Sequence, residues 1–337
     1  MDYFIGEKNL VMVKAFVFGK FLPFHKGHEA MIDFALGKCD FLTVLICSSD
    51  KEIITGINRK KWIEETFLRN TRIDVKVFNY FEHEMPNTSE SSEEVSKIWA
   101  KSFKQQFPDY SLLITSEKYG DYVAEFMGIK HILFDIQRNR YPISATQVRN
   151  NLFLNWQYLP NSVKVDYAKK VVILGTESTG KTVLSNQISA YFKCSLVSEA
   201  GREIISNSNS FSYSDLVLVA IEHSKQIQNA IFGDSPLIII DTDIHITKSY
   251  SKFIFQRELE VSYEITSSNQ ANLYLYLNND VEYVQDGTRL SKENRDLLDR
   301  SHRNILEEYQ IKYVEIKGNW EQRFDKAIEE IKRLLSL

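Results

Sequence analysis

The sequence predicts two α/β domains in tandem, each a three-layer arrangement with a parallel sheet between helices. Three observations lead to this fold class. Apolar strand candidates alternate with amphipathic segments, the alternation restarts near the middle, and the 337 residues exceed the roughly 100–200 expected of one domain. We place the domains at residues 12–160 and 168–337, because Pro160, Asn161 and Ser162 interrupt the periodicity between them.

Each half contains a series of short apolar runs that are predicted strands. In the first half, residues 27–39 and 92–107 have helical periodicity, and Ser92 is the expected N-cap of the second helix. The strand candidates of this half cover residues 13–18, 41–47, 73–78, 111–115 and 131–135. Those of the second half cover residues 169–175, 236–241, 272–277 and 311–316, with helices between them and one at the C-terminus. Such alternation predicts parallel sheets covered on both faces.

The composition indicates a soluble cytoplasmic protein. Apolar residues make up 43% of the chain, and the formal net charge of −4 provides no basic field for nucleic acid or an anionic membrane. Cys39, Cys47 and Cys194 lack the spacing of a disulfide framework or a zinc site. The N-terminal residues lack the basic start and long apolar run of a signal peptide, and no apolar run approaches the roughly 18 residues of a membrane span. We therefore expect neither a signal peptide nor a membrane span. We therefore expect small-molecule partners, and the oligomeric state stays open.

A phosphate-binding loop is predicted at GTESTGKT, residues 175–182, because the stretch follows an apolar strand and opens a helix. Gly175 and Gly180 allow the backbone N–H groups to converge on an anion at the helix N-terminus. Lys181 is placed to reach the β- and γ-phosphates of ATP, and the hydroxyl of Thr182 to bind magnesium. The remaining expected ATP contacts are Glu177, Ser178 and Thr179.

A second anion site is predicted near the N-terminus, in GKFLPFHKGH. A strand ends before Gly19, and His25 and His28 lie at the start of the next helix, where unpaired N–H groups and the helix dipole attract phosphate. Two imidazoles at this spacing donate hydrogen bonds to one phosphate, and Lys20 adds a cation. Zinc ligation by the two histidines is an alternative, but no third Cys, His or carboxylate ligand lies nearby at a recognisable spacing. The ordinary interpretation is a pair of histidines that cap a helix.

The end of the first domain supplies further anion-binding groups in PISATQVRN. Ser144 is a predicted N-cap, Thr146 lies in the first helical turn and Arg149 one turn further on. The planar guanidinium of arginine pairs with two phosphate oxygens and stays charged, so Arg149 suits the phosphates of ATP. Alone, this pattern is typical of a capped helix with a solvated arginine.

Together these residues resemble a known family. H-x-G-H near the first strand and I-S-x-T-x-x-R at the end of the domain form the paired signature of the nucleotidyltransferase superfamily. With the phosphate-binding loop behind them, the arrangement is similar to bifunctional nicotinamide-nucleotide adenylyltransferases and ribosylnicotinamide kinases of the NadR type. The resemblance spans Lys14 to Ile316. The stretches that carry it are GKFLPFHKGH, RKKWIEETF, TSEKYG, ISATQVRNN, NWQYLP, GTESTGKT, SEAGRE, IIDTD and DGTRL.

The resemblance implies a Rossmann-like nucleotidyltransferase fold and an adenylyltransferase activity for the first domain. ATP would bind between His25, His28 and Arg149, and the phosphate of nicotinamide mononucleotide would attack its α-phosphorus, giving NAD and pyrophosphate. No general base is required, because an ionised phosphate is already nucleophilic. Trp62 is the expected stacking partner of the nicotinamide ring, with a core aromatic as the alternative. Further substrate contacts are expected at Ser116 and Tyr119.

For the second domain the resemblance implies a P-loop kinase that phosphorylates ribosylnicotinamide with ATP and magnesium. Asp241 and Asp243 follow a buried strand, and one of them, Asp241 in our assignment, would hold Mg²⁺ together with Thr182. Asp243 is then expected to contact the substrate.

Three further residues of the second domain are assigned through the resemblance. Glu199 is the expected proton acceptor and Arg202 a substrate contact, with a surface ion pair as the alternative. Arg289 would close over the transferring phosphate from a lid-like loop, and its alternative is a solvated arginine.

Two other functions remain open at this stage. The first domain would transfer an adenylyl or cytidylyl group to another phosphorylated metabolite, or the second domain would bind nucleotide as a non-catalytic sensor. Regulatory members of the family carry a helix-turn-helix module in front, whereas about a dozen residues precede the first strand here. DNA binding is therefore not expected.

Overall fold

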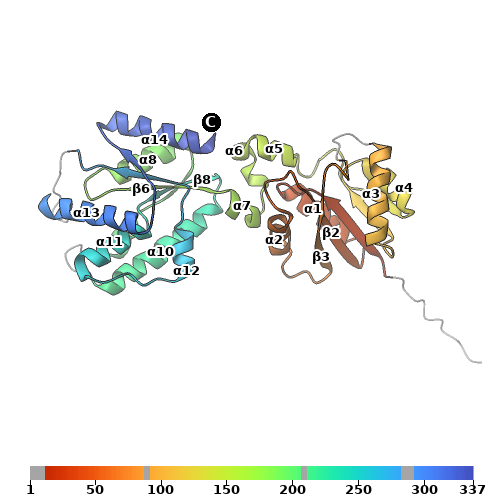
Figure 1. Cartoon of the computed structure of the whole chain (residues 1–337), viewed down its shortest axis with the longest axis horizontal. Helices are drawn as coiled ribbons and strands as arrows, with labels where there is room; N and C mark the ends of the chain where they lie inside the picture. Colours follow the sequence, from red (N-terminus) through yellow and green to blue (C-terminus); the bar gives the residue numbers. More distant parts are fainter. Residues whose placement is uncertain (1–11, 87–91, 206–210, 282–291, 337) are drawn as a thin grey trace, which may run out of the picture. The chain divides into compact units, whose positions relative to one another are not determined.

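The computed structural model describes residues 12–86, 92–205, 211–281 and 292–336. The chain divides into two compact units, Met1–Asp166 and Tyr167–Leu337. Each unit contains one parallel five-stranded sheet with helices packed on it (Figure 1). The expectation of two α/β domains is confirmed.

The sheet of the first unit has the strand order β3-β2-β1-β4-β5. All its neighbours pair in parallel, and β1 lies between β2 and β4, so the strand order reverses at the carboxyl end of β1. Open α/β sheets bind ligands at such a point. The strands are β1 (Lys14–Gly19), β2 (Phe41–Ser49), β3 (Ile73–Tyr80), β4 (Leu112–Thr115) and β5 (Lys130–Leu133).

Helices cover both faces of this sheet, with α1 and α2 on one side and α3 and α4 on the other (Figure 1). Ser92 caps α3 by accepting a hydrogen bond from the Val95 N–H, as predicted. The core between α3, α4 and the sheet is rich in aromatic residues, among them Phe16, Trp99 and Phe103. The helices are α1 (Lys26–Leu36), α2 (Gly56–Thr66), α3 (Glu93–Gln106), α4 (Tyr119–Met127), α5 (Ala145–Asn150), α6 (Leu152–Asn155), the 3₁₀ helix η1 (Trp156–Tyr158) and α7 (Asn161–Tyr167).

The sheet of the second unit has the order β10-β9-β6-β8-β7, again parallel throughout. Its central strand β6 leads directly into the predicted phosphate-binding loop. The strands are β6 (Lys169–Leu174), β7 (Ser195–Val197), β8 (Leu237–Asp241), β9 (Leu273–Leu277) and β10 (Val314–Ile316).

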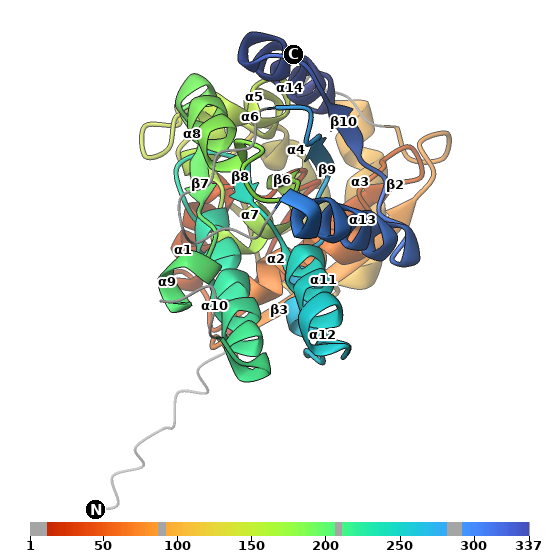
Figure 2. The same cartoon turned by 90° about the vertical axis from the view of Figure 1, so that its left-hand side faces the viewer.

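On one face of this sheet α10, α11 and α13 pack in succession, and on the other α8 packs against α14 (Figures 1 and 2). The helices are α8 (Lys181–Phe192), α9 (Gly201–Ile204), α10 (Tyr213–Ile231), α11 (Ile244–Phe255), α12 (Tyr263–Ser268), α13 (Lys292–Glu308) and α14 (Trp320–Leu335). Within the described residues, no helix is both long enough and apolar enough to cross a bilayer.

Candidate active sites

The two histidines of H-x-G-H form a stacked pair at the start of α1. His25 occupies the N-cap position, and the ring of His28 lies 3.7 Å from its ring, centroid to centroid, at an interplanar angle of 17°. The His25 backbone N–H donates to Nδ1 of His28 at 3.3 Å, which fixes the His28 ring. The His25 Nδ1 atom is buried and has no hydrogen-bond partner among the described residues. An anion at this helix start would supply one.

Both imidazoles are uncharged at neutral pH. Burial lowers the pKa of His25 to about 3, and the Arg138 guanidinium acts in the same direction. Burial, His25 and Arg138 together hold the pKa of His28 well below its usual value. Arg138, which the sequence analysis did not select, thus lies close enough to act electrostatically on both rings. A phosphate bound here would oppose these effects and favour protonation.

Arg149 points back toward the histidine turn. Its guanidinium donates to the Leu22 carbonyl oxygen and, at 3.0 Å, to the Thr146 hydroxyl. Ser144 caps α5 in a reciprocal arrangement with Gln147, so its hydroxyl serves the helix end. The structure thus brings two of these predicted residues, Thr146 and Arg149, beside the turn between β1 and α1, and gives Ser144 the role of a cap.

Lys20, just beyond Gly19, belongs to a charged network. Its ammonium group pairs with Glu52 at 3.1 Å, and Glu52 pairs at 2.6 Å with Arg59, whose side chain is fully buried. Arg59 also donates to the Ser48 hydroxyl at 2.6 Å and to the Lys20 carbonyl oxygen at 2.7 Å. Sequence reasoning missed Arg59, because a charged helix face at 58–65 looks solvated, and Glu52, because it lies in the turn before this helix. The network holds the backbone and ammonium group of Lys20 in place.

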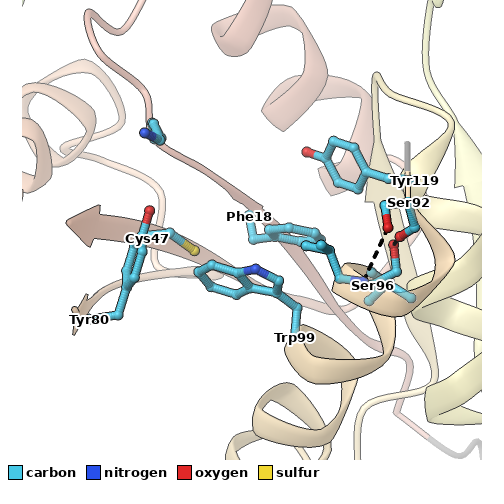
Figure 3. Close-up of a pocket in the computed structure, with 10 residues that line it drawn as sticks. Phe18, Cys47, Tyr80, Ser92, Ser96, Trp99 and Tyr119 are labelled. Carbon is cyan, nitrogen blue, oxygen red and sulfur yellow. Dashed lines mark hydrogen bonds between the residues drawn. The ribbon is translucent and has the colours of Figure 1, made fainter. Parts of the chain in front are cut away.

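An aromatic pocket of about 110 Å³ lies beside Lys20 (Figure 3). Phe18 comes from β1, Tyr80 from β3, Trp99 from α3 and Tyr119 from α4. Burial raises the pKa of the Cys47 thiol to about 12 and also raises the pKa of Tyr80 and Tyr119, so these groups stay neutral. The complete lining is Phe18, Lys20, Cys47, Tyr80, Ser92, Val95, Ser96, Trp99, Tyr119 and Val123.

This pocket changes the assignment of the stacking tryptophan. Trp62 is only 1% exposed, and its indole N–H donates to the Asp166 carboxylate at 2.6 Å. The structure therefore favours the core alternative for Trp62, since no face of its ring is open to a ligand. Trp99 borders the pocket instead, together with the predicted contact Tyr119. Ser116 lies at the carboxyl end of β4, in the segment that leads to Tyr119.

In the second unit, the Gly175–Thr182 segment curls as a phosphate-binding loop requires. Gly175 and Gly180 have φ of 139° and 87°, and Ser178 has φ of 59°. A β-carbon on Gly175 would lie 2.7 Å from the Leu277 carbonyl oxygen, so glycine is needed there. The Lys181 ammonium group donates to the Thr176 carbonyl oxygen at 3.0 Å. Lys181 is thus held against the loop.

Thr182 and Asp241 form a pair that suits magnesium. The Thr182 hydroxyl donates to Oδ2 of Asp241 at 2.6 Å, while Oδ1 of Asp241 is buried without a partner among the described residues. Burial raises the pKa of Asp241, and Lys181 and Thr182 act in the opposite direction. Mg²⁺ takes few protein oxygens and completes its shell with phosphates and water, so this pair fits it. No group of three or more His, Cys, Asp or Glu side chains suited to a metal occurs in the described part of the chain.

The other predicted residues of this unit have structural partners. Asp243 caps α11 and its Oδ2 lies 2.6 Å from Nδ1 of His245, so it is engaged within its own helix. Glu199 and Arg202 form the ion pair of the alternative interpretation, at 3.0 Å, with two thirds of the Arg202 side chain exposed. Arg289 lies outside the described residues.

Three contacts to the loop come from residues that the sequence analysis did not select. Tyr250 on α11 donates to the Glu177 carboxylate at 3.0 Å, and Arg295 on α13 donates to the Glu177 carbonyl oxygen at 3.0 Å. Arg323 on α14 donates to the Thr179 carbonyl oxygen at 2.8 Å. Their spacing from the loop, up to 144 positions in sequence, offers no local signal. The predicted ATP contact Glu177 is thus an anchor of the loop in this structure.

Comparison with known proteins gives a consistent result along almost the whole chain. Residues 170–323 match a family described as AAA domain. The chain is 27% identical to the trifunctional NAD biosynthesis/regulator protein NadR of Salmonella typhimurium, covering 98% of this chain and 84% of that protein. It is also 27% identical to the NadR of Escherichia coli, with coverage of 95% and 82%.

Two solved structures have the same fold. One is a NadR protein in complex with NR, with a TM-score of 0.66 and 18% sequence identity over 97% of both chains. The other is a NadR protein in complex with NAD and AMP-PNP, with a TM-score of 0.64 and 17% identity over 97% of both chains. The fold and the order of the two units are therefore shared with these proteins, and the chain is similar to NadR proteins over nearly its full length.

Proposed function

We propose that the chain is a bifunctional enzyme of NAD biosynthesis and salvage. The first unit would be a nicotinamide-nucleotide adenylyltransferase with a Rossmann-like fold, and the second a P-loop ribosylnicotinamide kinase. Similarity to NadR along nearly the whole chain supports the pairing. The solved NadR complexes with NR and with NAD and AMP-PNP suggest the substrates.

The observation that carries the proposal is the pairing of an anion site and an aromatic pocket at the carboxyl end of β1. Phe18 and Lys20 line the pocket, and the same segment continues to His25. The ring of Phe21, the residue after Lys20, lies 5.0 Å from that of His28, so the segment that borders the pocket leads directly to the histidine pair. Nicotinamide mononucleotide has a flat cationic ring at one end and a phosphate at the other, and each end finds a matching environment.

Adenylyl transfer follows from this arrangement without a general base. The mononucleotide phosphate is ionised and attacks the α-phosphorus of ATP, while the bond to the β-phosphate oxygen breaks and pyrophosphate leaves. His25 and His28 donate hydrogen bonds to oxygens on which charge develops, and Arg149 pairs with the leaving phosphates. Lys20, one of the residues that line the pocket, adds positive charge. Positioning and charge stabilisation carry the reaction.

The second unit would transfer the γ-phosphate of ATP to the ribose 5′-hydroxyl of ribosylnicotinamide. Lys181 would leave the Thr176 carbonyl oxygen for the phosphates, and the loop N–H groups would hold them. Thr182 and Asp241 would bind Mg²⁺, which neutralises the developing charge. Glu199 remains our candidate for the proton acceptor, and its pairing with Arg202 orients its carboxylate.

The test is an incubation of the purified chain with ribosylnicotinamide, ATP and magnesium. We expect nicotinamide mononucleotide to appear first and NAD second when products are followed by chromatography. If supplied mononucleotide becomes NAD while ribosylnicotinamide does not react, the kinase assignment is wrong. If neither ribosylnicotinamide nor nicotinamide mononucleotide reacts, but another phosphorylated metabolite does, the first unit catalyses a different nucleotidyl transfer.

A further inference from the structure

Trp320 lies directly beside the Gly175–Thr182 loop although it is distant in sequence. It is the first residue of α14, and its ring packs on Gly180 so closely that any side chain at Gly180 would collide with it. Despite this contact, Trp320 is 52% exposed. One part of the indole therefore rests on the loop, and another part is open beside the N-terminus of α8.

Arg323, one turn further along α14, fixes Trp320 relative to the loop. Its side chain is fully buried and donates to the carbonyl oxygens of Thr179 at 2.8 Å and Gly318 at 2.9 Å. It also donates to the Asn278 carbonyl oxygen at 3.0 Å and pairs with Asp280. One guanidinium thus connects the loop, the end of β9 and the turn before α14.

The turn that presents Trp320 is itself well defined. Gly318 has φ of 96°, and the Asn319 side chain caps α14 in a reciprocal arrangement with Gln322. The guanidinium of Arg323 lies 5.6 Å from the centroid of the Trp320 ring, which adds a cation–π contact. An exposed tryptophan held this firmly is a preformed surface, because little conformational entropy remains to be lost when a flat ligand covers it.

We propose that Trp320 is the stacking platform for the base of a purine nucleotide whose phosphates occupy the Gly175–Thr182 loop. The inference rests on the proposed function, because it requires that this loop binds nucleotide. Stacking on an aromatic side chain accepts any base but strengthens with the area of the π system, so adenine and guanine nucleotides bind more tightly here than cytosine and uracil nucleotides. Trp320 then positions ATP by its base, while Lys181 and Thr182 act on its phosphates.

The first experiment is calorimetric titration of AMP-PNP with magnesium into wild type, Trp320→Leu and Trp320→Phe. Each is compared with the same chain carrying Lys181→Ala, so that binding to the first unit is subtracted. We expect Trp320→Leu to weaken the Lys181-dependent binding about tenfold and Trp320→Phe about threefold or less. Tyr191→Leu is the matched control, because Tyr191 is a half-exposed aromatic residue of α8 that contacts Phe324 of α14 instead.

Tripolyphosphate, which has no base, separates stacking from support of the loop. Its Lys181-dependent affinity should be the same in wild type and in Trp320→Leu. Equal weakening of tripolyphosphate and AMP-PNP would overturn the inference and make Trp320 a support of the loop. Unchanged AMP-PNP affinity in Trp320→Leu would overturn it as well, while leaving the proposed kinase function intact. If Lys181→Ala changes no binding in wild type, the proposed nucleotide site fails and the inference with it.

Discussion

The two candidate sites would hold phosphate groups by different means. In the first unit the donors are two stacked, buried and uncharged imidazoles, with Arg149 hydrogen-bonded to the preceding turn. In the second unit the backbone of a tight loop is combined with Lys181 and a buried carboxylate, Asp241, that is paired with a hydroxyl. The contrast matches the nucleophiles of the proposed reactions. An ionised phosphate needs charge stabilisation alone, whereas a hydroxyl also gains from a metal and a proton acceptor.

A second contrast concerns how each site is held. The His25 and His28 rings are fixed by stacking and one hydrogen bond within a single helix start. The loop of the second unit is instead fixed by Tyr250, Arg295 and Arg323 from three different helices. Damage to the first site should therefore stay local, while the second depends on the packing of its whole unit.

The largest expected effect comes from Lys181→Ala. Removing a preorganised cation from a phosphoryl-transfer site reduces turnover by about 10²–10³-fold. We expect phosphorylation of ribosylnicotinamide to fall by at least that factor, while conversion of nicotinamide mononucleotide to NAD stays within about twofold. Separate assays of the two half-reactions measure this. Comparable loss of both would contradict the assignment of Lys181 to the kinase alone.

The reverse result is expected for His28→Ala. Loss of one hydrogen-bond donor to the developing charge should slow adenylyl transfer by about 10²-fold, with kinase turnover unchanged. His83→Ala, at an exposed position of the same unit, is the matched control and should change neither activity. An adenylyl transfer rate in His28→Ala equal to that of His83→Ala would remove His28 from the mechanism.

The architecture was largely predictable from sequence, and the reason is local. Strands of parallel sheets are continuous apolar runs, and β2, β6 and β8 are buried along most of their length. The conformation of the candidate phosphate-binding loop follows equally from a local pattern of glycines. The end of an apolar run does not mark the end of a strand, since β2 and β3 continue to Ser49 and Tyr80, two residues beyond the predicted limits.

Parts of the sites were not predictable, because they depend on contacts between distant segments. Trp62 and Trp99 both lie on amphipathic helices, and only the packing of α3 against β1 and α4 decides that Trp99 borders the pocket. Arg323 and Arg59 look like solvated arginines in sequence, yet both are fully buried and hydrogen-bonded to backbone carbonyl oxygens. Charge alone did not indicate their burial.

The low pKa of His25 predicts an effect of intermediate size, on the stability of the first unit at acidic pH. In the unfolded chain a histidine titrates near pH 6.5, whereas folded His25 stays neutral down to about pH 3. Between these values the unfolded state binds more protons, so stability falls as the pH decreases. His25 alone should lower the free energy of unfolding of the first unit by about 2 kcal/mol when the pH falls from 7.5 to 5.

Urea unfolding followed by tryptophan fluorescence at the two pH values measures this loss, since Trp62, Trp99 and Trp156 lie in the first unit. His25→Asn keeps a residue suited to the N-cap and should show a loss smaller by about 2 kcal/mol than wild type. His83→Asn should lose as much as wild type. An unchanged loss in His25→Asn would mean that other groups cause the acid sensitivity.

The smallest effect distinguishes the two tryptophans of the first unit. Because an indole is a better partner for a cationic ring than a phenyl group, Trp99→Phe should raise KM for nicotinamide mononucleotide about threefold. Trp62→Phe removes the hydrogen bond to Asp166 and should lower the free energy of unfolding by about 1 kcal/mol without changing KM. Steady-state kinetics and urea unfolding of both variants give the comparison.

The two variants make the same chemical change, at a tryptophan that lines the pocket and at one that no ligand can reach, so each is the control of the other. Trp99→Phe also loses a hydrogen bond, from its indole N–H to the Pro86 carbonyl oxygen, so some loss of stability is expected there too. The kinetic result is therefore decisive. A raised KM in Trp62→Phe with an unchanged KM in Trp99→Phe would restore Trp62 as the stacking residue and would require the buried face of α2 to open when substrate binds.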